Sequence, residues 1–323
     1  MFNNEGRLAV SQSYTLSDRC GATLYNEPQM WISNLSGRGG RIETLGRETG
    51  SIVPVVINDA GILAGFEAAV FSVNRIVLLN PVAGIPSARW QRRELSLFDS
   101  PLREKSGDFF LADIHSGGTV LCNTLSRAFT VSFDSLTILP DLTNDRTEDN
   151  LPSQRFTARV LQEDGTIIGY SQRLIDQDRF PEYSPDAEAS YFFRNGTYTE
   201  LGKPDGFDRV KAVHANAAGQ IVGTVRPVGS DVVRAFLWEN GQFTLFGPEG
   251  FSPRAIAGDG AIVGRVQNRA TLWQNGNPID LNTQIDNGSG YELQDAFSIN
   301  QRGQIVAQAS HNGQAWLVVL TRA

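Results

Sequence analysis

A short glycine-led motif recurs seven times along the chain, and it constrains the fold more than any other feature. In each copy a glycine introduces a short apolar strand, and a further aromatic or apolar strand follows. Internal repetition at a period of roughly 40–55 residues is typical of propellers and solenoids. The seven copies are Gly6-Arg-Leu-Ala-Val, Gly61-Ile-Leu-Ala-Gly, Gly118-Thr-Val-Leu-Cys, Gly165-Thr-Ile-Ile-Gly, Gly219-Gln-Ile-Val-Gly, Gly260-Ala-Ile-Val-Gly and Gly303-Gln-Ile-Val-Ala.

The repeat is clearest between residues 208 and 283, where apolar alternation predicts four strands in one unit. In the unit around Gly219, these strands are residues 210–216, 220–223, 234–238 and 242–246. The last two are joined by Asn-Gly, a strong hairpin signal because a type I′ turn needs positive φ at both central residues. This dipeptide occurs at Asn195-Gly196, Asn240-Gly241 and Asn275-Gly276.

Four antiparallel strands in each of seven units predict an all-β protein, a single seven-bladed β-propeller of four-stranded blades. A length of 323 residues suits one such domain. Propellers commonly close by pairing strands from both termini in one blade, and the sequence leaves open how this ring closes. Within one domain of residues 1–323, the expected blades cover approximately residues 1–47, 53–81, 109–140, 155–202, 208–247, 251–283 and 295–320.

An asparagine stands three residues before the glycine in four of the seven copies. Asparagine tolerates the left-handed backbone and hydrogen-bonds its own turn through its side chain, so the pattern predicts a structural role. His115 takes the same position in its copy and is expected to act in the same way. The four asparagines are Asn3, Asn58, Asn216 and Asn300.

Three stretches of the chain resemble the bacterial HAF repeats, which are usually found in predicted extracellular proteins. They are Ile57-Asn-Asp-Ala-Gly-Ile-Leu-Ala-Gly65, Ala235-Phe-Leu-Trp238 and Ser298-Ile-Asn-Gln-Arg-Gly-Gln-Ile-Val306. The resemblance implies an exported propeller, extracellular or periplasmic, and it implies no particular activity. The N-terminal residues have neither a basic nor an apolar signal-peptide region, so no signal peptide is expected in this chain.

Composition disfavours several classes of partner. A net charge of −7 disfavours a nucleic acid, and the absence of any apolar run near 18 residues disfavours membrane insertion. Cys20 and Cys122 match no metal-ligand spacing, and the sequence predicts neither a metal nor a cofactor. Cys122 lies in an apolar strand and is expected to be a buried thiol, although a bridge to Cys20 stays open.

The longest connections are expected on one face, because second-to-third and blade-to-blade connections leave a blade at the same end. Long loops on one end of a rigid scaffold are common sites of binding and catalysis. The oligomeric state stays open. The insertions are residues 13–29, 82–108, 140–154, 174–187, 227–232 and 284–294.

Arginines on these insertions are the candidate ligand-binding residues. In the segment Ala88–Glu94, three of them stand beside a tryptophan, a combination suited to carboxylate, sulfate or phosphate groups with ring stacking. The alternative is a charged loop packed on the rim. The full candidate set is Arg89, Trp90, Arg92, Arg93, Arg146 and Arg179.

Function is left between two classes. The first is a recognition module that binds a glycan or a protein on the long-loop face. The second is a carbohydrate-active enzyme, a lyase or hydrolase of an acidic sugar polymer, with Tyr183 or His115 as base and Asp178 or Glu182 as acid–base groups. The alternative for the loop that carries Tyr183 is an exposed polar lid. Whether the chain is an enzyme stays undecided.

Overall fold

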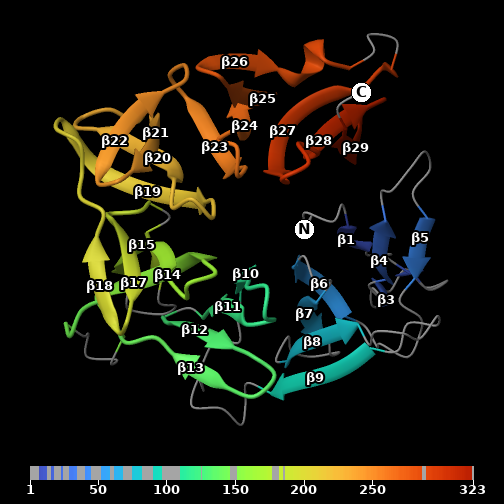
Figure 1. Cartoon of the computed structure of the whole chain (residues 1–323), viewed down its shortest axis with the longest axis horizontal. Helices are drawn as coiled ribbons and strands as arrows, with labels where there is room; N and C mark the ends of the chain where they lie inside the picture. Colours follow the sequence, from blue (N-terminus) through green and yellow to red (C-terminus); the bar gives the residue numbers. More distant parts are fainter. Residues whose placement is uncertain are drawn as a thin grey trace. The chain divides into compact units, whose positions relative to one another are not determined.

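The computed structural model is an all-β chain (Figure 1). It divides into two compact units, Met1–Leu139 and Pro140–Ala323, and each is described here by itself. The residues described are 7–12, 16–17, 23–24, 29–34, 41–44, 52–58, 62–67, 75–81, 90–96, 110–124, 126–145, 151–176, 182–184, 186–285 and 289–321.

The first unit contains two four-stranded antiparallel sheets, a three-stranded sheet and a small hairpin. The four-stranded sheets are β6 (Ile52–Ile57), β7 (Leu63–Glu67), β8 (Arg75–Pro81) and β9 (Trp90–Ser96), then β10 (Phe110–Ile114), β11 (Val120–Asn123), β12 (Ala128–Val131) and β13 (Leu136–Ile138). The three-stranded sheet is β1 (Arg7–Gln12), β4 (Gln29–Asn34) and β5 (Arg41–Thr44), and the hairpin is β2 (Leu16–Ser17) with β3 (Thr23–Leu24).

The second unit repeats the same antiparallel meander. Its first blade is β14 (Gln154–Leu161), β15 (Ile167–Asp176), β17 (Ser190–Arg194) and β18 (Thr197–Glu200), with β16 (Glu182–Tyr183) paired to β15. The next blades are β19 (Phe207–Ala215), β20 (Ile221–Pro227), β21 (Arg234–Glu239) and β22 (Gln242–Phe246), then β23 (Phe251–Ile256), β24 (Ile262–Val266), β25 (Arg269–Gln274) and β26 (Asn277–Asp280). A 3-10 turn η2 (Leu281–Thr283) precedes the last sheet, β27 (Glu292–Ile299), β28 (Ile305–His311) and β29 (Gln314–Leu320).

The fold is a β-propeller in which the described residues form five four-stranded antiparallel blades, and the prediction of seven such blades is wrong. The glycine motif marks the turn after the first strand, and it therefore counts turns rather than complete sheets. The two sheets nearest the ends of the chain contain three described strands each, β1-β4-β5 and β27-β28-β29. The motif alone cannot reveal how many strands pair around each turn.

The second glycine of the motif is explained by a bulge in the neighbouring strand. Gly223 of β20 pairs with Ala212 at the point where the register of β19 shifts. A Cβ atom at Gly223 would fall well inside van der Waals distance of the Lys211 carbonyl oxygen. Gly169 and Gly264 meet the carbonyl oxygens of their partner strands in the same way. In these three copies glycine leaves room for the bulged backbone of the partner strand. Cys122 and Ala307 occupy the same position in two other copies, so the glycine is not required in every blade.

The predicted turns are confirmed by the backbone. Asn240 has a φ of 51° and Gly241 a φ of 83°, as a type I′ hairpin requires, and Asn195 and Asn275 have φ values of 51° and 52°. The Asn216 side chain accepts hydrogen bonds from the backbone N–H groups of Ala218 and Gln220 at 3.1 Å each. The structural role predicted for Asn216 is thus confirmed. Asn3 lies outside the described residues.

These asparagines also connect neighbouring blades. Asn58 Nδ2 donates to the carbonyl oxygens of His115 and Ser116 at 2.9 Å each, in the next turn of the first unit. His115 Nδ1 accepts from Gly117 N at 2.9 Å, which confirms its expected part in the turn. The core between blades is apolar, and it includes the fully buried Phe129 and Phe236.

Candidate functional site

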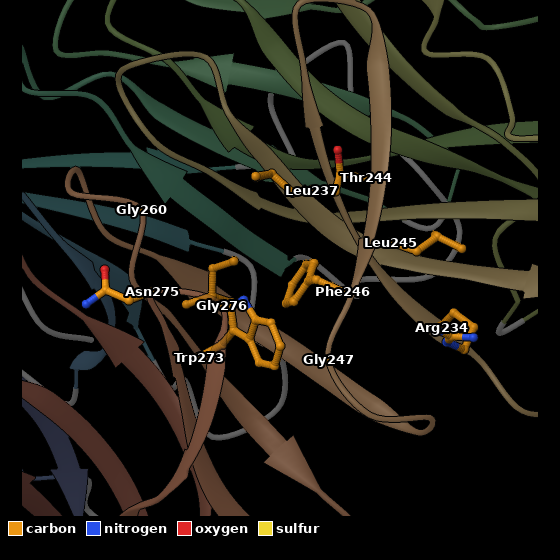
Figure 2. Close-up of a pocket in the computed structure, with 11 residues that line it drawn as sticks. Arg234, Leu237, Thr244, Leu245, Phe246, Gly247, Gly260, Trp273, Asn275 and Gly276 are labelled. Carbon is orange, nitrogen blue, oxygen red and sulfur yellow. The ribbon is translucent and has the colours of Figure 1, made fainter.

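A groove of about 560 Å³ lies between two neighbouring blades of the second unit (Figure 2). One wall comes from the outer strands β21 and β22, and the other from β24 and β25 with their turns. Asn275 and Gly276 lie at one end of the view and Arg234 at the other. The lining residues are Arg234, Leu237, Thr244, Leu245, Phe246, Gly247, Gly260, Ile262, Trp273, Asn275 and Gly276.

Strand register determines which of these side chains face the groove. Leu237 pairs with Thr244, and Phe246 pairs with Ala235, so all four share the face of the blade that packs on β23 and β24. Arg234 pairs with Val225, which belongs to the core on the opposite face. The blade therefore presents an apolar surface with one hydroxyl to the groove, and Arg234, at the start of β21, lines the groove at its end.

An aromatic pair forms the centre of the groove. The rings of Phe246 and Trp273 have centroids 5.4 Å apart and planes inclined at 45°. Both side chains are half-buried, and Ile262, the register partner of Trp273, is buried. Thr244 and Asn275 at the margin are exposed and supply a hydroxyl and an amide. The site thus combines ring surface with neutral hydrogen-bonding groups and, at one end, the guanidinium group of Arg234.

The groove residues were missed by the sequence analysis, although the repeat carries a signal for them. Trp238 and Trp273 occupy the same place in successive third strands, opposite Ile221 and Ile262. Trp238 packs on Phe192 of the preceding blade with centroids 5.0 Å apart, and its Nε1 is buried without a hydrogen-bond partner among the described residues. Packing between the blades decides which repeat tryptophan borders a groove.

A charged cluster occupies a second place in this unit. Arg209 Nη1 donates to Asp186 Oδ2, and Arg226 lies 3.8 Å from the same oxygen through its Nη1. Arg226 also donates to both oxygens of Asp208, at 3.2 Å from Nε and 2.8 Å from Nη2. The hydrogen bond from Arg226 holds the pKa of Asp208 below its ordinary value. Asp186 belongs to the insertion 174–187 that the sequence singled out.

The predicted arginine loop is in fact largely a strand. Residues 90–96 form β9, the fourth strand of the blade β6–β9, paired with β8. Arg92 pairs with Leu79 and Arg93 with Leu78 in that register, so the prediction of a loop here is wrong. Pairing of an outer strand needs only its backbone groups, which a charged sequence supplies as well as an apolar one. Trp90 begins this strand, whereas Arg89, Arg146 and Arg179 lie outside the described residues.

Some of the candidate catalytic residues lie in described strands or turns, and one lies outside the described residues. Glu182 and Tyr183 form the short strand β16, in which Tyr183 pairs with Leu174. Asp178 lies outside the described residues. His115 is a turn residue whose Nδ1 is engaged by Gly117 N, as described above. Their proposed catalytic roles stay predictions.

The other two histidines make distinct contacts. Burial lowers the pKa of His214 to about 4, and the positive charge of Arg159 adds to this. His214 Nδ1 accepts from Ile256 N at 3.4 Å, as its neutral ring allows. His311 stacks on Tyr291 with ring centroids 4.4 Å apart. Neither of these contacts involves a residue that lines the groove.

Other sequence expectations can be located as well. Cys122 is a free, fully buried thiol, as expected, and burial raises its pKa. Among the described residues, no three His, Cys, Asp or Glu side chains are grouped so that they would hold a metal ion. In the same part of the chain, no helix is long and apolar enough to cross a membrane.

Comparison with known proteins identifies the fold. The chain is similar to the β-propeller domain of the Trilobed protease from Pyrococcus furiosus, a propeller with an open velcro topology, at 11% identity and a TM-score of 0.59; the match covers 98% of this chain and 93% of that one. It is also similar to a prolyl endopeptidase at 14% identity and a TM-score of 0.52, and there it spans 47% of the other chain. At these identities the similarity shows a β-propeller fold alone.

No family model matches the sequence. No curated protein matches it either. The resemblance to HAF repeats, and the export that it implies, therefore stay predictions.

Proposed function

We propose that this chain is a recognition module and that it binds a glycan in the groove between β21–β22 and β24–β25. The proposal is carried by one observation, the pairing of half-buried Phe246 and Trp273 beside exposed Thr244 and Asn275. A sugar ring has an apolar face of C–H groups and an edge of hydroxyls. Aromatic rings suit the first, and hydroxyl and amide groups suit the second.

The size of the groove fits such a ligand. A volume of about 560 Å³ lies within the ordinary range of small-molecule sites, roughly 300–1,000 Å³. Glycines at positions 247, 260 and 276 form part of the lining, so backbone groups border the ligand closely. A protein ligand is the alternative that the sequence left open. The aromatic pair beside an exposed hydroxyl and amide favours the glycan, and Arg234 is the charged residue of the lining.

Tryptophan fluorescence and calorimetric titration with neutral hexasaccharides of glucose, xylose and mannose test the proposal. We expect one of these sugars to bind, and Trp273→Ala to weaken that binding about tenfold or more, a loss of about 1.4 kcal/mol or more. Trp273→Phe retains a ring and is expected to lose less. Asn275→Gly removes the amide while keeping the left-handed turn, and should weaken binding by a few-fold.

Trp316→Ala is the matched control. Trp316 lies on β29 in another sheet and is 45% exposed, so its loss tests whether an exposed tryptophan binds sugars non-specifically. Equal weakening by Trp273→Ala and Trp316→Ala would contradict the proposal. So would binding that survives Trp273→Ala unchanged.

A further inference from the structure

Two arginines of one blade stand directly opposite each other. Arg209 of β19 and Arg226 of β20 are register partners, and like charges in such positions repel. Asp186 lies against both, through the single oxygen Oδ2. Asp208 neutralises Arg226 with a two-point contact, at 2.8 and 3.2 Å. The pair of guanidinium groups is therefore stabilised by carboxylates, one of which reaches both.

The carboxylate that bridges the pair is the most exposed member of the cluster. The Asp186 side chain is 58% exposed, whereas those of Arg209 and Arg226 are 22% and 24% exposed. Asp186 comes from the connection between β16 and β17, in the neighbouring blade, and the arginines come from paired strands. The cation pair is thus fixed in the sheet, and its bridging anion approaches from the solvent side.

A second cluster with the same chemistry differs in this respect. Arg254 of β23 donates to Asp295 through Nη2 at 2.8 Å, and Arg265 Nε lies 3.8 Å from the same carboxylate. Asp295 belongs to strand β27, and its side chain is only 6% exposed. A ligand cannot take the place of this carboxylate without opening the sheet. The Asp295 cluster is therefore a buried structural ion pair, whereas the Asp186 cluster is accessible from solvent.

We propose that Arg209 and Arg226 bind a carboxylate of an acidic glycan, and that Asp186 occupies this position until the ligand displaces it. Planar guanidinium groups bind carboxylates in preference to point anions, because their N–H groups match both oxygens. The choice of a glycan rests on the proposed function, since the same blade, β19–β22, forms one wall of the groove. A uronic acid residue offers both groups, a carboxylate for the arginine pair and a sugar ring for the groove.

The test measures binding of a galacturonic acid hexamer and of a neutral hexasaccharide to the full chain, by titration at low and at high salt. Asp186→Asn should raise affinity for the uronate about five- to fiftyfold, because it removes the competing carboxylate, and leave the neutral sugar unaffected. Arg209→Lys and Arg226→Lys, which keep the charge and lose the planar fork, should lower uronate affinity about tenfold. Salt should weaken uronate binding alone.

Asp295→Asn is the matched control, and it should lower thermal stability without raising uronate affinity. Unchanged or weaker uronate binding by Asp186→Asn would overturn the inference, as would Lys variants that bind like the wild type. Binding of polyglutamate with the same dependence on Asp186 would overturn the glycan assignment. Loss of neutral-sugar binding in Trp273→Ala is a separate result, so the groove proposal stands or fails independently.

Discussion

Asn216 donates a hydrogen bond from Nδ2 to the carbonyl oxygen of Ala257, at 3.0 Å. The bond is buried, and it joins the first turn of the blade β19–β22 to the equivalent turn of the blade β23–β26. Asn216 also receives a bond on its carbonyl oxygen from Gln162 Nε2, at 3.0 Å, in the blade before it. Gln162, Asn216 and Ala257 each stand three residues before the motif glycine, so this repeated position links the turns of three successive blades.

Replacing Asn216 by alanine should lower the free energy of unfolding by about 1–3 kcal/mol. The side chain bonds its own turn and the buried carbonyl of Ala257, and its loss removes these bonds, leaving that carbonyl only the bond from Gly260 N. Chemical denaturation measures the change. Asn277→Ala is the control, since its exposed side chain bonds only to a neighbouring carbonyl in the same hairpin, and it should cost less than about 0.5 kcal/mol. Equal effects of the two substitutions would contradict the linking role.

Gly223→Ala should destabilise the protein by several kcal/mol, about 2 or more. The added methyl group would meet the Lys211 carbonyl oxygen and the ring of Phe236, and the bulged strand β19 cannot move without losing its ladder. Gly258→Ala is the matched control, because nothing lies within 4 Å of its added Cβ. Thermal melting of both variants checks the prediction, which fails if Gly223→Ala melts at the temperature of Gly258→Ala.

Asp295→Asn should lower the free energy of unfolding by about 3 kcal/mol, because it leaves Arg254 and Arg265 beside a neutral, buried amide. The exposed pair of Arg194 and Asp164, 3.1 Å apart, supplies the comparison. Arg194→Gln should change stability by no more than about 1 kcal/mol, since exposed ion pairs are screened by water. Denaturant titration at neutral pH measures the free energy of unfolding of both variants. Similar losses would contradict the expectation that the buried ion pair contributes more than the exposed one.

His214 should make stability fall as pH falls from about 6.5 towards 4. Its pKa is lowered to about 4 in the folded chain, so the unfolded chain binds the proton first, and protons favour unfolding across this window. The stability contributed by neutral His214 is fully present above the pKa of the unfolded chain. Up to about 3 kcal/mol of it is lost as the pH falls to the folded pKa. His214→Gln, whose amide oxygen can accept from Ile256 N, should flatten the profile between pH 6.5 and 4. Denaturation at a series of pH values measures the difference, and parallel profiles would exclude the effect.

Several features of the fold were predictable because they depend on local backbone geometry. Asn240-Gly241 specifies its hairpin through positive φ at both residues, and Asn216 specifies its turn through its own side chain. The alternating strands around them follow from the same repeat. The strand at residues 90–96 escaped prediction because an outer strand is held by backbone pairing and needs no alternating pattern.

The sequence by itself determined the repeated antiparallel unit, its turns and its all-β class, because these arise from interactions between residues close together in the chain. Only the tertiary structure decided how many blades are complete, that Phe246 meets Trp273 across two blades, and that Asp186 reaches Arg209 and Arg226. These contacts join different repeats. They depend on packing and on register between blades, which no local pattern of residues specifies.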